Sequence, residues 1–138
     1  MIQRRQSLWL LLSTISAFLS YKLPFFSGTR IGAKNLTEKA ILDGGSSFFL
    51  LIITGISLIL SFITIFMFKD RKLQFKLCIT GVIFSVILLV LYFNEMSKLS
   101  GSISLSSVFV FAIPIGYIMA AYGIRRDEKL VKSLDKLR

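Results

Sequence analysis

The stretch FFLLIITGISLILSFITIFMF, at residues 48–68, decides the fold. Its 21 residues include no charged residue and no proline. A helix of this length extends about 31 Å, which is close to the thickness of the hydrocarbon core of a bilayer. The basic segment KDRKLQFK follows at residues 69–76, and another apolar run begins directly after it. This pattern predicts two membrane helices joined by a short basic turn.

The same pattern of apolar runs and polar connections repeats along the chain. It predicts four transmembrane helices, at residues 8–26, 48–68, 77–93 and 103–122. The expected fold is an all-α bundle of four membrane-spanning helices in a single domain of 138 residues. Pro114 lies in the middle of the fourth run, where it removes a backbone hydrogen bond and is expected to kink the helix.

Two polar segments have helical signals of their own. In the connection at residues 27–47, Asn35 and Glu38 have the spacing of a capping box, which predicts a short helical turn through Leu42. The tail at residues 124–138 has apolar residues on one helical face and charges on the other, which predicts an amphipathic helix. Two alternatives remain open for this tail: it continues the fourth helix into water, or it lies on the membrane surface.

The positions of lysine and arginine predict the orientation. Twelve of the 17 cations lie in the N-terminal segment, the turn at residues 69–76 and the tail, and the first and third connections hold four. By the positive-inside rule, both termini and the tail lie on the cytoplasmic side of the inner membrane, and the 27–47 connection is external. Basic segments beside membrane helices are also typical of contact with anionic headgroups. We therefore expect membrane lipids as partners, with a membrane protein or a second copy of the chain as further candidates.

The composition excludes several classes of protein. Apolar residues make up 54% of the chain, which is more than a soluble domain of this size can bury. The net charge of +10 is divided among segments beside apolar runs, so we expect no nucleic-acid partner. The single cysteine, Cys78, excludes an internal disulfide and a cysteine-based zinc site, and a small buried apolar role is expected for it. With no histidine and no acidic residue inside any predicted span, we expect no enzyme activity, no metal and no cofactor.

Small residues recur along the predicted spans at helical spacing. In membranes such residues allow two helix backbones to approach closely. The candidates for helix packing and for the kink are Gly81, Ser85, Ala112, Pro114, Gly116 and Ala120.

The two ends and the middle turn carry a resemblance. The segments MIQRRQSLWLLL at residues 1–12, RKLQFKLC at residues 71–78 and the tail IRRDEKLVKSLDKLR together resemble a family of small four-span membrane proteins, typical of Bacteroidetes and catalogued as a domain of unknown function. The likeness covers essentially the whole chain. It implies an inner-membrane location and four helices, and it supplies no activity, cofactor or catalytic residue.

The leading hypothesis is a non-catalytic membrane protein, acting as an accessory, assembly or interaction factor through helix contacts and a basic cytoplasmic face. The alternative is a small transporter or lipid-handling protein with a cavity around the Pro114 kink. The residues predicted to contact lipid headgroups or an acidic partner are Arg4, Arg5, Lys69, Arg71, Lys72, Arg125 and Arg126.

Overall fold

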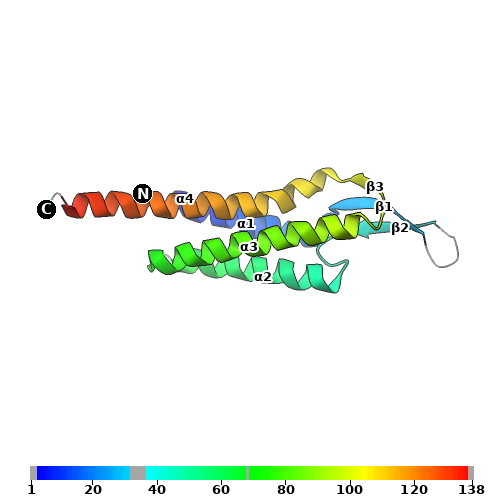
Figure 1. The fold of residues 1–138 in the computed structure, drawn as a ribbon, viewed down its shortest axis with the longest axis horizontal. Helices are drawn as coiled ribbons and strands as arrows, with labels where there is room; N and C mark the ends of the chain where they lie inside the picture. Colours follow the sequence, from blue (N-terminus) through cyan, green and yellow to red (C-terminus); the bar gives the residue numbers. More distant parts are fainter. Residues whose placement is uncertain (1–2, 32–36, 68, 137–138) are drawn as a thin grey trace.

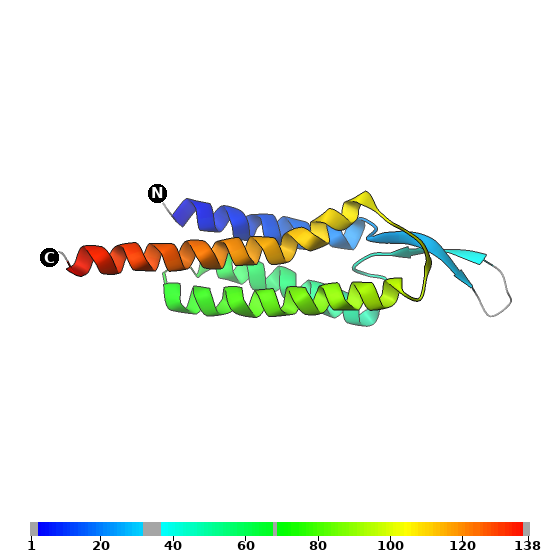
Figure 2. The same cartoon turned by 45° about the horizontal axis from the view of Figure 1, so that its top comes forward.

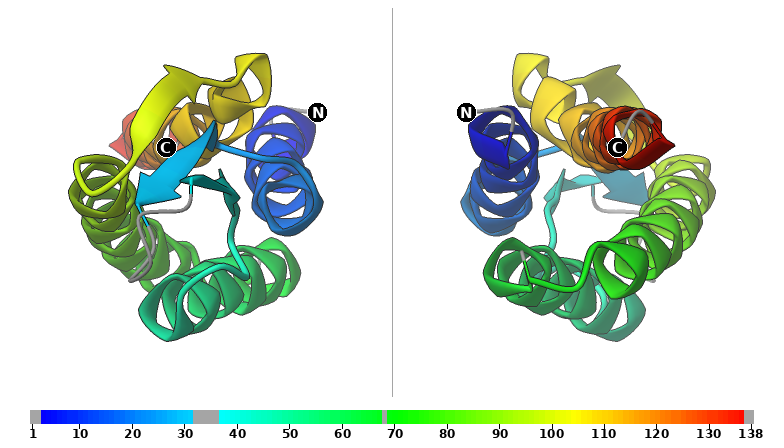
Figure 3. Two further views of the ribbon diagram at one scale, coloured as in Figure 1. Left: turned by 90° about the vertical axis from the view of Figure 1, so that its right-hand side faces the viewer. Right: turned by 90° about the vertical axis from the view of Figure 1, so that its left-hand side faces the viewer.

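The molecule is an antiparallel four-helix bundle with a small sheet at one end. The computed structural model describes residues 3–31, 37–67 and 69–136. Within them, four long helices lie side by side: α1 (Gln3–Lys22), α2 (Phe48–Phe66), α3 (Arg71–Met96) and α4 (Val108–Lys136) (Figure 1). Each helix packs against two others in the ring order α1, α2, α3, α4, as the views along the bundle show (Figure 3). Both termini lie at the end opposite the sheet (Figure 2).

The helices bury many small and polar residues, together with a few large ones such as Leu10, Leu50, Leu88 and Tyr117, and leave most of their large apolar residues exposed. The buried positions of α2 include Thr54, Ser57, Ser61 and Thr64, while Phe62 is 51% exposed. The other helices follow the same rule, with outward-facing residues such as Leu8, Leu11, Ile15 and Phe18 on α1, Ile83, Val86 and Val90 on α3, and Ile115 and Ile118 on α4. A soluble bundle places its large apolar residues in the core. This reversed arrangement suits a bundle surrounded by lipid, in which helices associate through small residues and hydrogen bonds.

Three of the described helices are long and apolar enough to cross a membrane. They are α2, α3 and the segment Leu105–Lys136, which joins the short helix η1 (Leu105–Ser107) to α4. This confirms the prediction of membrane-type helices at these three places. The described part of α1 does not meet the same criteria, so the count of four spans remains a prediction.

The all-α prediction is wrong at the end of the bundle that lacks the termini. Three antiparallel strands form a sheet there in the order β2–β1–β3: β1 (Phe26–Ile31), β2 (Thr37–Leu42) and β3 (Ser100–Ile103). The helical turn predicted through Leu42 is therefore strand β2, and Asn35 of its proposed capping box lies outside the described residues. The pairing supplies backbone hydrogen bonds from neighbouring strands, including one that arrives from a distant part of the sequence. A capping box describes only neighbouring residues, so it cannot predict that a segment pairs with other strands.

Glycine makes the pairing of β1 with β3 possible. Gly28 is the register partner of Gly101, and a Cβ on Gly101 would overlap the backbone of Gly28. At the root of the sheet Phe25 is 1% exposed, and its ring lies 4.4 Å from the ring of Tyr92. The sheet thus closes this end of the helical core.

The structure decides between the two alternatives for the tail. Residues 124–136 continue α4 without interruption, so the tail extends the fourth helix beyond the bundle (Figure 1). Residues 137–138 lie outside the described part of the chain. Pro114 is buried within α4, and the first turns of this helix are inclined to the rest (Figure 2), in agreement with the expected kink.

Candidate functional site

Charge is separated along the axis of the bundle. At the end that carries the termini, the residues whose side chains the structure describes include ten cations and four acids; the cations are Arg5, Lys69, Arg71, Lys72, Lys76, Arg125, Arg126, Lys129, Lys132 and Lys136. At the sheet end, four described cations (Lys22, Arg30, Lys39 and Lys98) face three acids. One end of the molecule is therefore strongly basic and the other nearly neutral.

A pocket at the basic end gathers cations from two elements. It has a volume of about 510 Å³ and lies between the turn from α2 to α3 and the tail of α4. The turn and the first residues of α3 contribute Lys69, Arg71, Lys72 and Lys76, and α4 contributes Lys132. Two acids, Asp70 and Glu128, also line it. This pocket, called the basic pocket below, has an excess of positive charge that suits a phosphate-bearing headgroup.

The α4 side of the basic pocket is organised by one ion pair. Lys132 Nζ lies 2.8 Å from Glu128 Oε1, one helical turn away. The hydrogen bond from Lys132 and its positive charge lower the pKa of Glu128 below the ordinary value of 4.5. Because the Lys132 side chain is 70% exposed, this pair is a weak contact at the edge of the pocket.

The structure separates the predicted headgroup residues into groups. Lys69, Arg71 and Lys72 lie together in the basic pocket. Arg125 places its guanidinium carbon 4.6 Å from the centroid of the Phe75 ring, a cation–π contact that ties α4 to α3.

The remaining predicted cations lie on the other side of α4. Arg5 and Arg126 line a separate pocket between α1 and α4. The side chain of Arg4 lies outside what the structure describes. The predicted set is thus one cluster of three, one pair and one arginine held by an aromatic ring.

The small residues on α4 lie at its contact with α1. A Cβ on Gly116 would lie 2.8 Å from the backbone oxygen of Trp9, so the two helices touch there through their backbones. Ala120 is fully buried one turn later, while Ala112 is only half-buried. In α3, a Cβ on Gly81 would overlap the ring of Tyr117, and buried Ser85 donates its hydroxyl to Val82 O at 2.8 Å within its own helix.

Hydrogen bonds between helices cross the interior of the bundle. The Tyr117 hydroxyl donates to Ser57 O at 2.7 Å, and Ser13 donates to Ile113 O at 2.7 Å. Gln74 donates to Thr64 O at 3.2 Å. The three pockets that we describe lie at the two ends of the molecule, and Pro114 lines none of these three. At this level the core is filled by Tyr117 and its neighbours.

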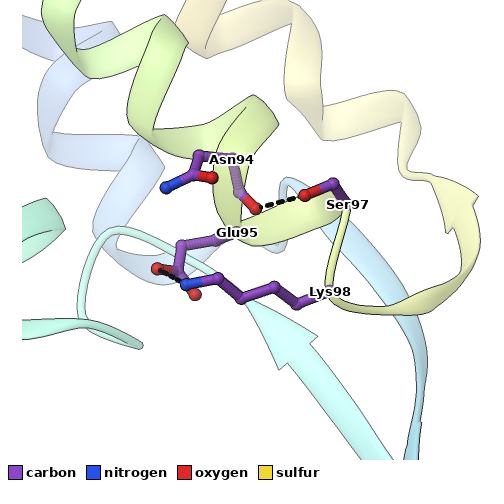
Figure 4. A network of polar contacts seen from close by, with 4 residues as sticks. All are labelled: Asn94, Glu95, Ser97 and Lys98. Atoms are coloured by element: carbon purple, nitrogen blue, oxygen red, sulfur yellow. Dashed lines mark hydrogen bonds and ion pairs between the residues drawn. The ribbon is translucent and has the colours of Figure 1, made fainter.

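The sheet end carries local polar contacts at the end of α3. Lys98 pairs with Glu95 at 2.9 Å, and the Ser97 hydroxyl donates to the backbone oxygen of Asn94 at 2.7 Å (Figure 4). The Lys98 side chain is 51% exposed, so this ion pair contributes little stability. A small hollow of about 120 Å³ lies beside it, lined by residues of both signs. This hollow has a smaller excess of positive charge than the basic pocket.

Residues 2–137 match a family described as "Domain of unknown function (DUF4293)". The chain belongs to this family. The resemblance inferred from the two ends and the middle turn is therefore confirmed, since the DUF4293 match covers nearly the whole chain. The assignment of the family to Bacteroidetes and to four-span proteins remains a prediction. No curated protein and no solved structure matches the chain.

One buried acid of this DUF4293 chain was missed by sequence reasoning. Asp127 was grouped with the charges of the tail, but it is 5% exposed and accepts a hydrogen bond from the amide of Gln6 on α1. A signal for it exists in the sequence. Asp127 continues the buried positions Tyr117, Ala120 and Ile124 at alternating steps of three and four residues.

Proposed function

We propose that this protein is a non-catalytic, four-span protein of the cytoplasmic membrane that acts as an accessory or assembly factor. Both termini would lie on the cytoplasmic side, where the basic pocket binds anionic phospholipid headgroups. The observation that carries this proposal is the concentration of charge at one end, with five cations gathered around a pocket of about 510 Å³. Cytoplasmic loops of membrane proteins carry such an excess of lysine and arginine, and the cytoplasmic leaflet is rich in anionic lipid.

The geometry of α1 supports counting it as a membrane span, which brings the proposed number of spans to four. This helix packs along α4, with Gln6 beside Asp127 near one end and Ser13 beside Ile113 further along. If α4 crosses the bilayer, α1 lies at the same depth. Its outward residues between Leu8 and Phe18 are large and apolar, which suits contact with lipid. The serines that lower its average hydropathy face the interior.

The proposal is tested by removing the cations of the turn. The variant K69Q/R71Q/K72Q neutralises three residues that line the basic pocket. Each cation near an anionic surface contributes about 1 kcal/mol, so the variant should bind anionic lipid up to about 3 kcal/mol more weakly. Purified protein in nanodiscs of phosphatidylcholine with increasing phosphatidylglycerol, followed by native mass spectrometry of retained lipid, measures this change.

The matched control removes the same charge from the sheet end. The variant R30Q/K39Q/K98Q takes three cations from exposed positions there, and it should retain anionic lipid as the wild type does. Equal loss in both variants would show that total charge, rather than the basic pocket, governs retention. No loss in the first variant would refute the proposed lipid site.

The transport alternative requires a cavity at the Pro114 kink. Tyr117 occupies the core at this level, with its hydroxyl bonded to Ser57 O and its ring against Gly81. The packing around Pro114 therefore favours the accessory role, and we do not propose transport.

A further inference from the structure

A second pocket at the basic end contains a buried carboxylate. It lies between the first turns of α1 and the end of the apolar part of α4, with a volume of about 440 Å³. Asp127 lines it together with Arg5 and Arg126, and Trp9 and Tyr122 add aromatic rings. We call it the Asp127 pocket. It shares no lining residue with the basic pocket, although α4 contributes to both.

The Asp127 carboxylate is only half satisfied by the protein. Oδ2 accepts the hydrogen bond from Gln6, whereas Oδ1 is buried without a hydrogen-bond partner among the described residues. A buried carboxylate oxygen without a donor is costly, because the charge has lost its water. This oxygen therefore calls for a donor from outside the chain, and a cationic donor offsets the charge best.

The two arginines of the pocket, Arg5 and Arg126, are free to bind a negatively charged group of a ligand. The structure describes no ion pair between Asp127 and either Arg5 or Arg126, and both arginines are exposed. Guanidinium groups bind phosphate through paired hydrogen bonds. Trp9 and Tyr122 are the residue types that lie at the headgroup level of a bilayer. The pocket thus offers a site for an anion and a site for a cation, beside aromatic residues of the kind found at headgroup depth.

We propose that the Asp127 pocket binds a phospholipid with a primary ammonium headgroup, of the phosphatidylethanolamine type. The phosphate contacts Arg5 and Arg126, and the ammonium donates a hydrogen bond to Asp127 Oδ1. A choline headgroup has the same charges but no N–H, so it leaves Oδ1 without a donor. A glycerol headgroup can donate a hydroxyl but brings no positive charge to the carboxylate.

The single tryptophan of the chain provides the measurement, because Trp9 lines the pocket. The full chain is reconstituted in phosphatidylcholine vesicles, and brominated-chain lipids with different headgroups are exchanged in to quench Trp9 fluorescence. The wild type should prefer phosphatidylethanolamine over phosphatidylcholine about tenfold, as expected for one hydrogen bond to a charged group. The preference should fall stepwise as the headgroup amine is methylated. Equal quenching by all headgroups would overturn the proposal, and this series needs no variant.

Two variants then locate the selectivity. Asp127→Asn keeps an acceptor for Gln6 but removes the charge, so it should lose the preference for the ethanolamine headgroup. Asp135→Asn removes an exposed acid of the same helix that lines neither this pocket nor the basic pocket, and should keep the preference. A preference retained in Asp127→Asn, or lost equally in both variants, would refute the role of Asp127. Soluble phosphoethanolamine is added in a final arm, and displacement of the lipid at matched concentration would assign the site to the small phosphate ester instead.

Discussion

At the scale of single residues, Tyr117 is the main contact among helices in the centre of the bundle. It is fully buried on α4, its hydroxyl reaches Ser57 O on α2, and its ring lies against Gly81 on α3. One side chain thus joins three helices. Because the hydrogen bond fixes the far end of the ring, the ring cannot move away when a neighbour grows.

This arrangement predicts the effect of Gly81→Ala. The added methyl group would overlap the Tyr117 ring, and overpacking of this kind costs about 1–3 kcal/mol. The better helix propensity of alanine opposes that loss by at most about 1 kcal/mol. We therefore expect a net loss of stability, measured by thermal unfolding in mild detergent. In Gly45→Ala, the nearest atom to the new methyl group is Asp43 Oδ1 at 3.5 Å, so this control should unfold as the wild type does. A fully stable Gly81→Ala variant would contradict the packing.

Residues also show where sequence analysis reached its limit. Cys78 was predicted as a small buried residue and is fully buried. Asp127 was missed because it stands among the charged residues of the tail, although it continues the spacing of the buried positions of α4. Its partner Gln6, more than 100 residues away, is known only from the structure.

At the scale of elements, the end of α4 depends on its own charges. Beyond Asp127 its residues are mostly exposed, and the pair Glu128–Lys132, with the Lys132 side chain 70% exposed, adds only a small stabilisation to the last turns. The lowered pKa of Glu128 means that the pair stabilises the helix above pH 4.5. This stabilisation is lost as the pH falls through the lowered pKa, where the carboxylate takes up a proton.

We therefore expect the last turns of α4 to fray in acid. Amide protection factors for residues 129–136, which correct for the intrinsic pH dependence of exchange, should fall as the pH is lowered below 4.5. Glu128→Gln should show low protection at every pH, without the acid transition. A wild-type tail whose protection does not change with pH would argue against any contribution from the pair.

The elements differ in how far the sequence predicts them. The helices could be predicted because each apolar run carries its own signal of length and hydropathy, and α2 begins at Phe48 as predicted. The strands could not, because β1 and β2 are short, polar sequences and β1 also pairs with β3 more than 60 residues later. Such pairing is a property of the assembled bundle, since β1 follows α1, β2 precedes α2 and β3 follows α3 at the same end (Figure 1).

At the scale of the whole molecule, the separation of charge predicts the orientation. Exposed Ser46 lies at the sheet end and exposed Ser133 on the tail, so each can carry a reporter cysteine once buried Cys78 is replaced by alanine. A membrane-impermeant maleimide should label Ser46→Cys in intact spheroplasts and Ser133→Cys only after lysis. The reverse pattern, or labelling of both positions in intact cells, would overturn the proposed topology.

The contact between α1 and α4 constrains the order of events during biosynthesis. Helix α1 is made before α4, and its polar face includes Gln6 and Ser13, whose partners Asp127 and Ile113 are made at least 100 residues later. Until α4 is made, the polar groups of that face lack their partners on α4. Lipid headgroups, water or the insertion machinery must then satisfy their hydrogen bonds. A nascent chain stopped before α4 would therefore expose an incompletely satisfied helix, a feature that quality-control proteases can recognise.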